Sequence, residues 1–196
     1  MYEVEMKFRI ASPSDFERKL ETFGVVLEPA VEEFDQFYRH PARDFAKTDE
    51  GLRIRRRVFA DGSEERFLTY KGPKIDPLTK TRKEIEIPLE VDQPWHDVLT
   101  ALDFQPAAVV VKTRRRGTLE ENGRSFDIVL DQLPEFGFFT ELETIASEAD
   151  KDAARQALLV LAAKLGLDES IRMGYLEMLT NNPCGSRTSP SPSFFP

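Results

Sequence analysis

The sequence predicts a mainly β (α+β) fold, an antiparallel β-barrel of about eight strands with a charged interior and helices packed outside. Three observations support this prediction. Most of the chain divides into short segments in which apolar and polar side chains alternate, as they do in strands. Turn signals separate these segments. The few helical segments each have an apolar face that needs a partner.

The first half of the chain contains a helix and several of the expected strands. Residues 2–10 alternate cleanly, and Ser12-Pro13-Ser14-Asp15 can begin a helix over residues 14–23, which Gly24 ends. His40-Pro41-Ala42 breaks the extended segment that follows, and Ala60-Asp61-Gly62-Ser63 is a hairpin turn signal. The strands expected in this half cover residues 2–10, 25–39, 51–59, 65–71 and 82–89.

The second half repeats this mixture in a different order. Asp92-Gln93-Pro94 opens a helix over residues 94–103, and Glu121-Asn122-Gly123 is a tight turn between two strands. A strongly amphipathic helix over 149–165 ends at Gly166, and a short helix is expected near 169–180. The strands expected in this half cover residues 107–118, 124–131 and 138–146.

Composition and charge limit the functional classes to which the protein can belong. The 196 residues carry a net charge of −8, which argues against general nucleic-acid binding. No run approaches the roughly 18 apolar residues that a membrane span needs, and the N-terminal residues lack a signal-peptide pattern. Cys184 is the single cysteine. We therefore expect a cytoplasmic protein without nucleic-acid or membrane partners, with one domain over 1–180 and a disordered, Pro- and Ser-rich tail over 181–196.

The polar faces of the strands are almost entirely charged. In one interpretation these faces point to water and pair across the sheet. In the other they line a wide, wet tunnel, while the helices cover the apolar faces outside. The apolar faces of the three longer helices favour the second interpretation. The charged positions are Glu3, Glu5, Lys7, Arg53, Arg55, Lys71, Arg82, Glu84, Glu86, Lys112, Arg114, Asp131, Glu141 and Glu143.

The residues that would line such a tunnel indicate which kind of ligand it binds. Carboxylates two residues apart on one strand face can share a hard cation such as Mg²⁺ or Mn²⁺. Arginine and lysine on facing strands match phosphate oxygens. The chain has no Gly-rich phosphate-binding loop, so side chains on strands must hold the phosphates. These features together predict a site for a metal–polyphosphate complex.

Several sequence blocks carry a resemblance to a known family. Glu3-Val4-Glu5-Met6-Lys7 matches an E-x-E-x-K signature, and supporting blocks run through Arg43–Arg55, Thr69–Lys74 and Asp131–Glu143. On these blocks, over roughly residues 2–180, the chain resembles the CYTH superfamily of triphosphate tunnel metalloenzymes. Within it, the chain is most similar to the CyaB-type, class IV adenylate cyclases.

The resemblance implies an eight-stranded tunnel, a divalent cation (Mg²⁺ or Mn²⁺) and a triphosphate substrate, and it leaves a homodimer open. Expected metal ligands are Glu3, Glu5, Asp131, Glu141 and Glu143. Expected phosphate contacts are Lys7, Arg53, Arg55, Lys71, Arg82, Lys112 and Arg114. Expected catalytic residues are Glu3, Glu5, Lys7 and Lys112.

Three functional hypotheses follow from these assignments. The leading one is cyclisation of ATP to cyclic AMP and pyrophosphate. The alternative is a triphosphatase that hydrolyses inorganic triphosphate, thiamine triphosphate or a nucleoside triphosphate in the same tunnel. A third is a non-catalytic sensor of polyphosphate or nucleotide, which the full carboxylate set disfavours. No general base is evident, because His40 and His96 are both predicted to be peripheral.

Overall fold

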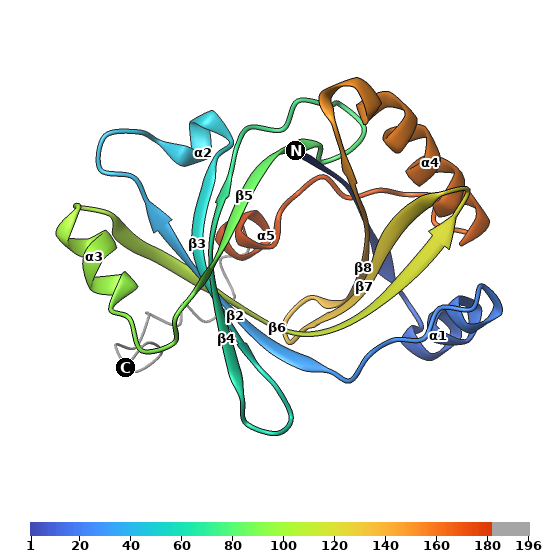
Figure 1. Cartoon of the computed structure of the whole chain (residues 1–196), viewed down its shortest axis with the longest axis horizontal. Coiled ribbons are helices and arrows are strands. Elements are labelled where there is room, and N and C mark those ends of the chain that lie inside the picture. Colours follow the sequence, from blue (N-terminus) through green and yellow to red (C-terminus); the bar gives the residue numbers. More distant parts are fainter. Residues whose placement is uncertain (182–196) are drawn as a thin grey trace. The chain divides into compact units, whose positions relative to one another are not determined.

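A computed structural model describes residues 1–181. Its eight strands form one sheet in the hydrogen-bonded order β1-β5-β4-β3-β2-β6-β7-β8, which closes because β1 pairs antiparallel with both β5 and β8 (Figure 1). The predicted antiparallel barrel is therefore confirmed. Of the predicted tail, Asn181 is the last residue of a helix, and residues 182–196, with Cys184, lie outside the described residues.

The element boundaries follow the sequence pattern closely. The strands are β1 (Tyr2–Ile10), β2 (Val31–Arg39), β3 (Gly51–Val58), β4 (Glu64–Lys71), β5 (Arg82–Leu89), β6 (Gln105–Glu121), β7 (Arg124–Leu133) and β8 (Gly137–Ala146). The helices are α1 (Pro13–Thr22), α2 (Phe45–Thr48), α3 (Trp95–Ala101), α4 (Lys151–Lys164) and α5 (Tyr175–Asn181), with a 3₁₀ turn, η1 (Glu148–Asp150). The sequence did not predict α2 or η1, and the expected helix at 169–180 begins only at Tyr175.

The chain divides into two compact units, each assembled from segments far apart in the sequence. Unit 1 comprises Met1–Val31, Lys74–Lys83 and Lys112–Arg172. Unit 2 comprises Glu32–Pro73, Glu84–Val111 and the chain from Met173. These units do not coincide with the two halves visible in the sequence, because strand pairing joins distant segments.

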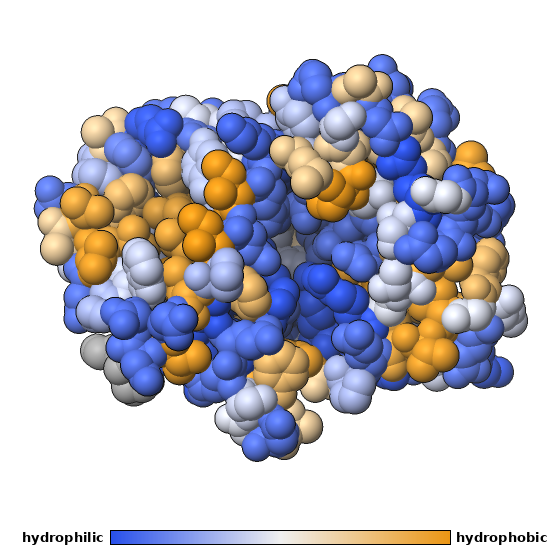
Figure 2. Space-filling model, in the orientation of Figure 1, coloured by the Kyte–Doolittle hydropathy of each residue, from blue (hydrophilic) through white to orange (hydrophobic). Residues whose placement is uncertain are grey.

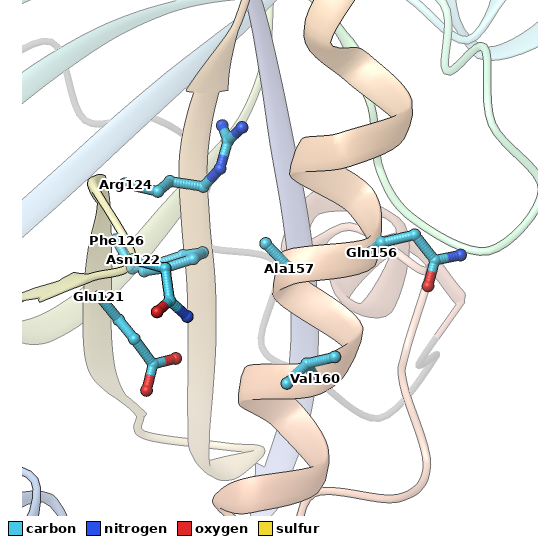
Figure 3. Close-up of a pocket in the computed structure, with 7 residues that line it drawn as sticks. All are labelled: Glu121, Asn122, Arg124, Phe126, Gln156, Ala157 and Val160. Atoms are coloured by element: carbon cyan, nitrogen blue, oxygen red, sulfur yellow. The ribbon is translucent and has the colours of Figure 1, made fainter.

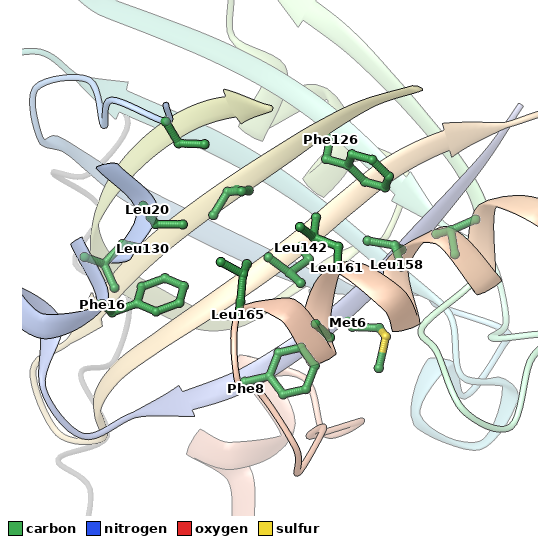
Figure 4. Packing of buried hydrophobic residues seen from close by; sticks show 14 of the residues in the cluster. Met6, Phe8, Phe16, Leu20, Phe126, Leu130, Leu142, Leu158, Leu161 and Leu165 are labelled. Atoms are coloured by element: carbon green, nitrogen blue, oxygen red, sulfur yellow. The ribbon is translucent and has the colours of Figure 1, made fainter. Parts of the chain in front are cut away.

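In unit 1, the apolar face of the strands packs against α1 and α4. Phe8 of β1 and Leu142 of β8 are buried together with Leu20 of α1 and with Leu158 and Leu161 of α4 (Figure 4). Successive side chains of a strand point to opposite faces, so the charged residues of β1 and β8 are turned away from both helices. This arrangement agrees with the prediction of helices outside and charge inside.

Unit 2 has its own smaller core. Tyr38 of β2, Ile54 of β3 and Leu89 of β5 are buried with Leu99 of α3. Unit 2 also exposes apolar side chains, which Figure 2 shows as orange surface over α3. The exposed apolar residues of β5 and α3 are Ile85, Ile87, Val98 and Leu102.

Strand β2 begins six residues later than the extended segment predicted at 25–39. The reason is a close approach between residues 25–28 and β6. The backbone N–H of Glu28 donates to the carbonyl of Arg116 (2.7 Å), and a Cβ on Gly117 would lie 2.7 Å from Val25 Cγ1. Glycine at 117 therefore leaves room for this segment to cross β6 instead of continuing a regular strand.

Truncation of the unit 1 core tests the packing of α4. Leu158 is fully buried, so we expect Leu158→Ala to lower the free energy of unfolding by about 2–5 kcal/mol. The matched control is Val160→Ala on the same helix, where the side chain is 51% exposed and the expected change is within about 0.5 kcal/mol. Urea denaturation measures both, and equal losses would contradict the packing described.

Candidate active site

Strand register brings the predicted metal and phosphate residues of unit 1 onto one face. In the β1–β8 pair, Glu5 lies opposite Glu143 and Lys7 lies opposite Glu141. Alternate residues of a strand share a face, so these side chains form one group. In the β6–β7 pair, Arg114 lies opposite Asp131, and in the β1–β5 pair Glu3 lies opposite Arg82.

Arg114 is the cationic centre of this group. Its guanidinium donates two hydrogen bonds to Asp131, at 2.6 and 2.5 Å, and a third to Glu141 at 2.6 Å. All three side chains are buried. A planar guanidinium matches a carboxylate in this two-bond geometry, which holds both carboxylates in fixed positions.

Lys80 belongs to the group although the sequence did not single it out. Its ammonium group donates to the Glu5 carboxylate and lies 3.4 Å from Glu141 Oε1. Burial opposes its charge, but Glu5 and Glu141 outweigh burial and raise the pKa of Lys80. The missed signal is the period-two spacing of Lys80, Arg82 and Glu84, which continues the alternation of β5 backwards by two residues.

The carboxylates on β8 have opposite electrostatic surroundings. Burial raises the pKa of Glu141, but Lys80, Arg114 and Lys7 overcome it and hold that pKa well below its usual range. For Glu143, burial and then the charges of Glu3, Glu141 and Glu5 raise the pKa well above its usual range, with Arg114 opposing them. The surroundings of Glu143 therefore disfavour its charged form, whereas those of Glu141 favour it.

Lys7 and Lys112 are the two most deeply buried lysines predicted to bind phosphate. Each is 1% exposed. Burial first, and then the charge of Lys80, lower the pKa of Lys7 to about 7, while Glu141 and Glu5 act in the opposite direction. Lys7 therefore lies close to Glu5, Glu141 and Lys80 and belongs to the same charged group.

The donor chemistry of this group fits a hard divalent cation. Its oxygen ligands would be carboxylates, which Mg²⁺ and Mn²⁺ prefer, and strand pairing places two of them, Glu5 and Glu143, opposite each other. Within residues 1–181, no three acidic, histidine or cysteine side chains are already arranged as a metal centre. Lys80 and Arg114 contact the carboxylates instead.

Unit 2 holds the other predicted phosphate-binding residues. Asp35 on β2 accepts two hydrogen bonds from Arg55, at 2.6 and 2.8 Å, and one from Arg53 at 3.2 Å. Glu33 lies 3.3 Å from Arg55 and accepts a hydrogen bond from Arg57 at 3.0 Å. Glu33 and Asp35 were not among the predicted site residues, although their spacing repeats that of Glu3 and Glu5.

Glu84 contacts two cations in unit 2. It pairs with Lys71 and lies 3.9 Å from Arg53. Glu86 accepts a hydrogen bond from the hydroxyl of Thr69 at 3.0 Å. The carboxylates on β2 and β5 therefore hold Arg53, Arg55 and Lys71 in defined positions on their strands.

Comparison with known proteins identifies the family. The CYTH domain profile matches residues 1–175. The chain belongs to the CYTH domain family. A Methanocaldococcus jannaschii protein named as a candidate adenylate cyclase is 32% identical over 181 residues, which cover 91% of this chain and 98% of that protein.

Solved structures share the fold of this CYTH chain. A Pyrococcus horikoshii protein superposes with a TM-score of 0.80 at 37% identity, covering 91% of this chain and 98% of its own. A Hippeastrum protein, described as an adenylyl cyclase candidate with a dominant triphosphatase activity, superposes with a TM-score of 0.56 at 18% identity, covering 88% and 91%. At 18% identity, the similarity to the Hippeastrum protein shows a shared fold alone.

Both histidines of this CYTH protein have structural contacts. Nδ1 of His96 lies 2.9 Å from the hydroxyl of Tyr38. Nδ1 of His40 accepts the backbone N–H groups of Ala42 and Arg43, both at 3.0 Å, and its ring lies edge-on to Phe104. These contacts give each ring a structural partner, and the absence of an evident general base stays a prediction.

A pocket in unit 1 lies apart from the predicted residues. It has a volume of about 240 Å³ and is lined by the β6–β7 hairpin and by α4 (Figure 3). Its charged residues are already paired, Arg124 with Asp150 and Glu121 with Lys164, each at 2.7 Å. It contains none of the site residues.

In the described part of the chain, no helix has the length and apolar character needed to cross a membrane.

The ion pairs of unit 2 predict a stability effect. Asp35 is buried and bound to two arginines, so Asp35→Asn should lower the free energy of unfolding by about 3–5 kcal/mol. Glu65→Gln is the matched control, because Glu65 is 51% exposed at 3.7 Å from Arg57, and we expect a loss of less than about 1 kcal/mol. If chemical denaturation gave the two variants equal free energies of unfolding, the buried arginines would not need Asp35 to compensate their charge.

Proposed function

We propose that this CYTH protein is a cytoplasmic class IV adenylate cyclase-like enzyme that converts ATP to cyclic AMP and pyrophosphate with Mg²⁺ or Mn²⁺. The main support is the buried charged group of unit 1, in which carboxylates and cations lie together on paired strands. A protein needs compensation for burying so many charges, and a metal–triphosphate ligand is complementary to both signs. The similarity to the Methanocaldococcus protein favours cyclisation.

The metal-binding set in this proposal is the one predicted from the sequence. Carboxylate oxygens on β1, β7 and β8 would hold the cation, with Glu5 and Glu143 opposite each other on paired strands. When bound, a divalent cation supplies the positive charge that activates the attacking ribose hydroxyl and neutralises the pyrophosphate that leaves. The proposed ligands are Glu3, Glu5, Asp131, Glu141 and Glu143.

Basic residues on the strands bind the phosphates in this proposal. The proposed phosphate contacts of unit 1 are Lys7, Arg82, Lys112 and Arg114, and those of unit 2, taken by itself, are Arg53, Arg55 and Lys71. The carboxylates paired with Arg53, Arg55 and Arg114 orient the guanidinium groups before substrate arrives. Preorganised cations stabilise developing charge without reorganising during the reaction.

A triphosphatase is the alternative function. The same charged group can hold a triphosphate while water attacks the terminal phosphorus. The Hippeastrum protein, which shares the fold, is described as having a dominant triphosphatase activity. The two reactions differ in which phosphorus meets the nucleophile, so their products distinguish them directly.

Product analysis tests the proposed function. Purified protein is incubated with Mg²⁺ or Mn²⁺ and, separately, with ATP, thiamine triphosphate and inorganic triphosphate. We expect cyclic AMP and pyrophosphate from ATP. Release of orthophosphate without cyclic AMP would establish the triphosphatase instead. Triphosphate binding without turnover of any of the three would point to a sensor.

Substitution of the carboxylates tests the metal-binding set. We expect Glu5→Gln and Glu143→Gln each to reduce metal-dependent turnover by about 100-fold or more, because each removes a charged ligand while conserving shape. Glu120→Gln on β6 is the matched control, since Glu120 is exposed and outside the group. Circular dichroism checks that each variant is folded. A folded Glu143→Gln variant with full activity would show that Glu143 is not a metal ligand.

A further inference from the structure

The loop between β4 and β5 buries polar side chains and exposes apolar ones. Thr79, Lys80 and Thr81 are only 1%, 3% and 3% exposed, whereas Ile75 and Leu78 are 53% and 51% exposed. A surface loop ordinarily places its polar residues in water and its apolar residues inside. Burying a lysine in this way is unfavourable unless a partner compensates the charge.

Local hydrogen bonds hold the loop in this conformation. Asp76 Oδ1 accepts the backbone N–H groups of Leu78 and Thr79, both at 2.8 Å, and the hydroxyl of Thr79 at 3.0 Å. The N–H of Lys80 donates to the carbonyl of Glu5 at 2.9 Å. The loop is therefore attached to β1 directly beside Glu5, with the Lys80 side chain directed to the carboxylates.

The Lys80 ammonium group takes up oxygens that the proposed metal site needs. It donates to Oε1 of Glu5 and lies 3.4 Å from Oε1 of Glu141, and these carboxylates come from neighbouring strands. Lone pairs that accept from an ammonium group are not available to a divalent cation. Two cations at this position would also repel one another strongly at such short range.

We propose that Lys80 is a tethered counter-ion that neutralises Glu5 and Glu141 when no metal is bound and is displaced when a divalent cation binds. The inference rests on the proposed function, because it takes Glu5 and Glu141 as metal ligands. Displacement releases the Lys80 side chain from the carboxylates. Lys80 thereby sets the metal affinity and spares the carboxylates from repulsion before the metal arrives.

Metal binding by a charge-neutral variant tests this proposal. Lys80→Met keeps the length and apolar stem of the side chain and removes the ammonium group. We expect its dissociation constant for Mn²⁺, measured by isothermal titration calorimetry without nucleotide, to fall by about tenfold or more. Lys83→Met is the matched control, because Lys83 is exposed, lies three residues later and should leave the affinity unchanged.

The outcomes separate this inference from the proposed function. Mn²⁺ binding to the wild type with equal or weaker binding to Lys80→Met would overturn the counter-ion role and leave the metal site intact. If neither protein bound Mn²⁺, with or without inorganic triphosphate, both the metal site and the counter-ion role would be wrong. Tighter binding by both lysine variants would indicate a general charge effect and would also overturn the proposal.

A measurement on the wild type covers the case in which Lys80→Met does not fold. Acetic anhydride modifies lysine amines that are free of ion pairs, and mass spectrometry identifies the modified residues. We expect modification of Lys80 to increase several-fold when Mn²⁺ replaces a chelator, while modification of Lys83 stays constant. Unchanged modification of Lys80 at saturating Mn²⁺ would show that the metal does not displace it.

Discussion

Burying an ionised side chain costs several kcal/mol unless an opposite charge and hydrogen bonds compensate it, and the rest of this structure depends on that constraint. Carboxylates and cations are buried together on the strands. Asp131 is held by Arg114 in unit 1, and Asp35 is held by Arg53 and Arg55 in unit 2. Such pairs contribute little net stability. Their main effect is to hold charged groups in positions where a ligand of mixed charge can bind.

Strand geometry allows this charge to coexist with a normal core. Each strand has two faces, and in β1 both are buried. One face packs Val4, Met6 and Phe8 with the helices, and the other carries Glu5 and Lys7. In unit 1 the helices thus remove the apolar faces of the strands from water, and the opposite faces of these strands can carry charge. The closed strand order also removes the free sheet edges that an open sheet would expose.

The CYTH assignment and the site geometry support one another, but they carry different information. The family match covers residues 1–175 and establishes the domain. The surroundings of the two carboxylates on β8 differ. Glu141 has Lys80 and Arg114 beside it, whereas Glu143 is acted on by Glu3, Glu141 and Glu5 as well as by Arg114. Together with the register that places Glu5 opposite Glu143, this supports including both carboxylates in the proposed metal-binding set.

The sequence by itself determined the strands, their charged faces and the family signature, because period-two alternation and Glu3-Val4-Glu5-Met6-Lys7 are local properties of the chain. It did not reveal Lys80, Glu33 or Asp35 as members of the charged groups. Their partners are distant in the sequence, and only the tertiary structure, in which the backbone N–H of Lys80 donates to the carbonyl of Glu5, brings Lys80 to Glu5 and Glu141. The tertiary structure also decided the composition of the two units, since strand pairing selects neighbours by register and not by sequence order.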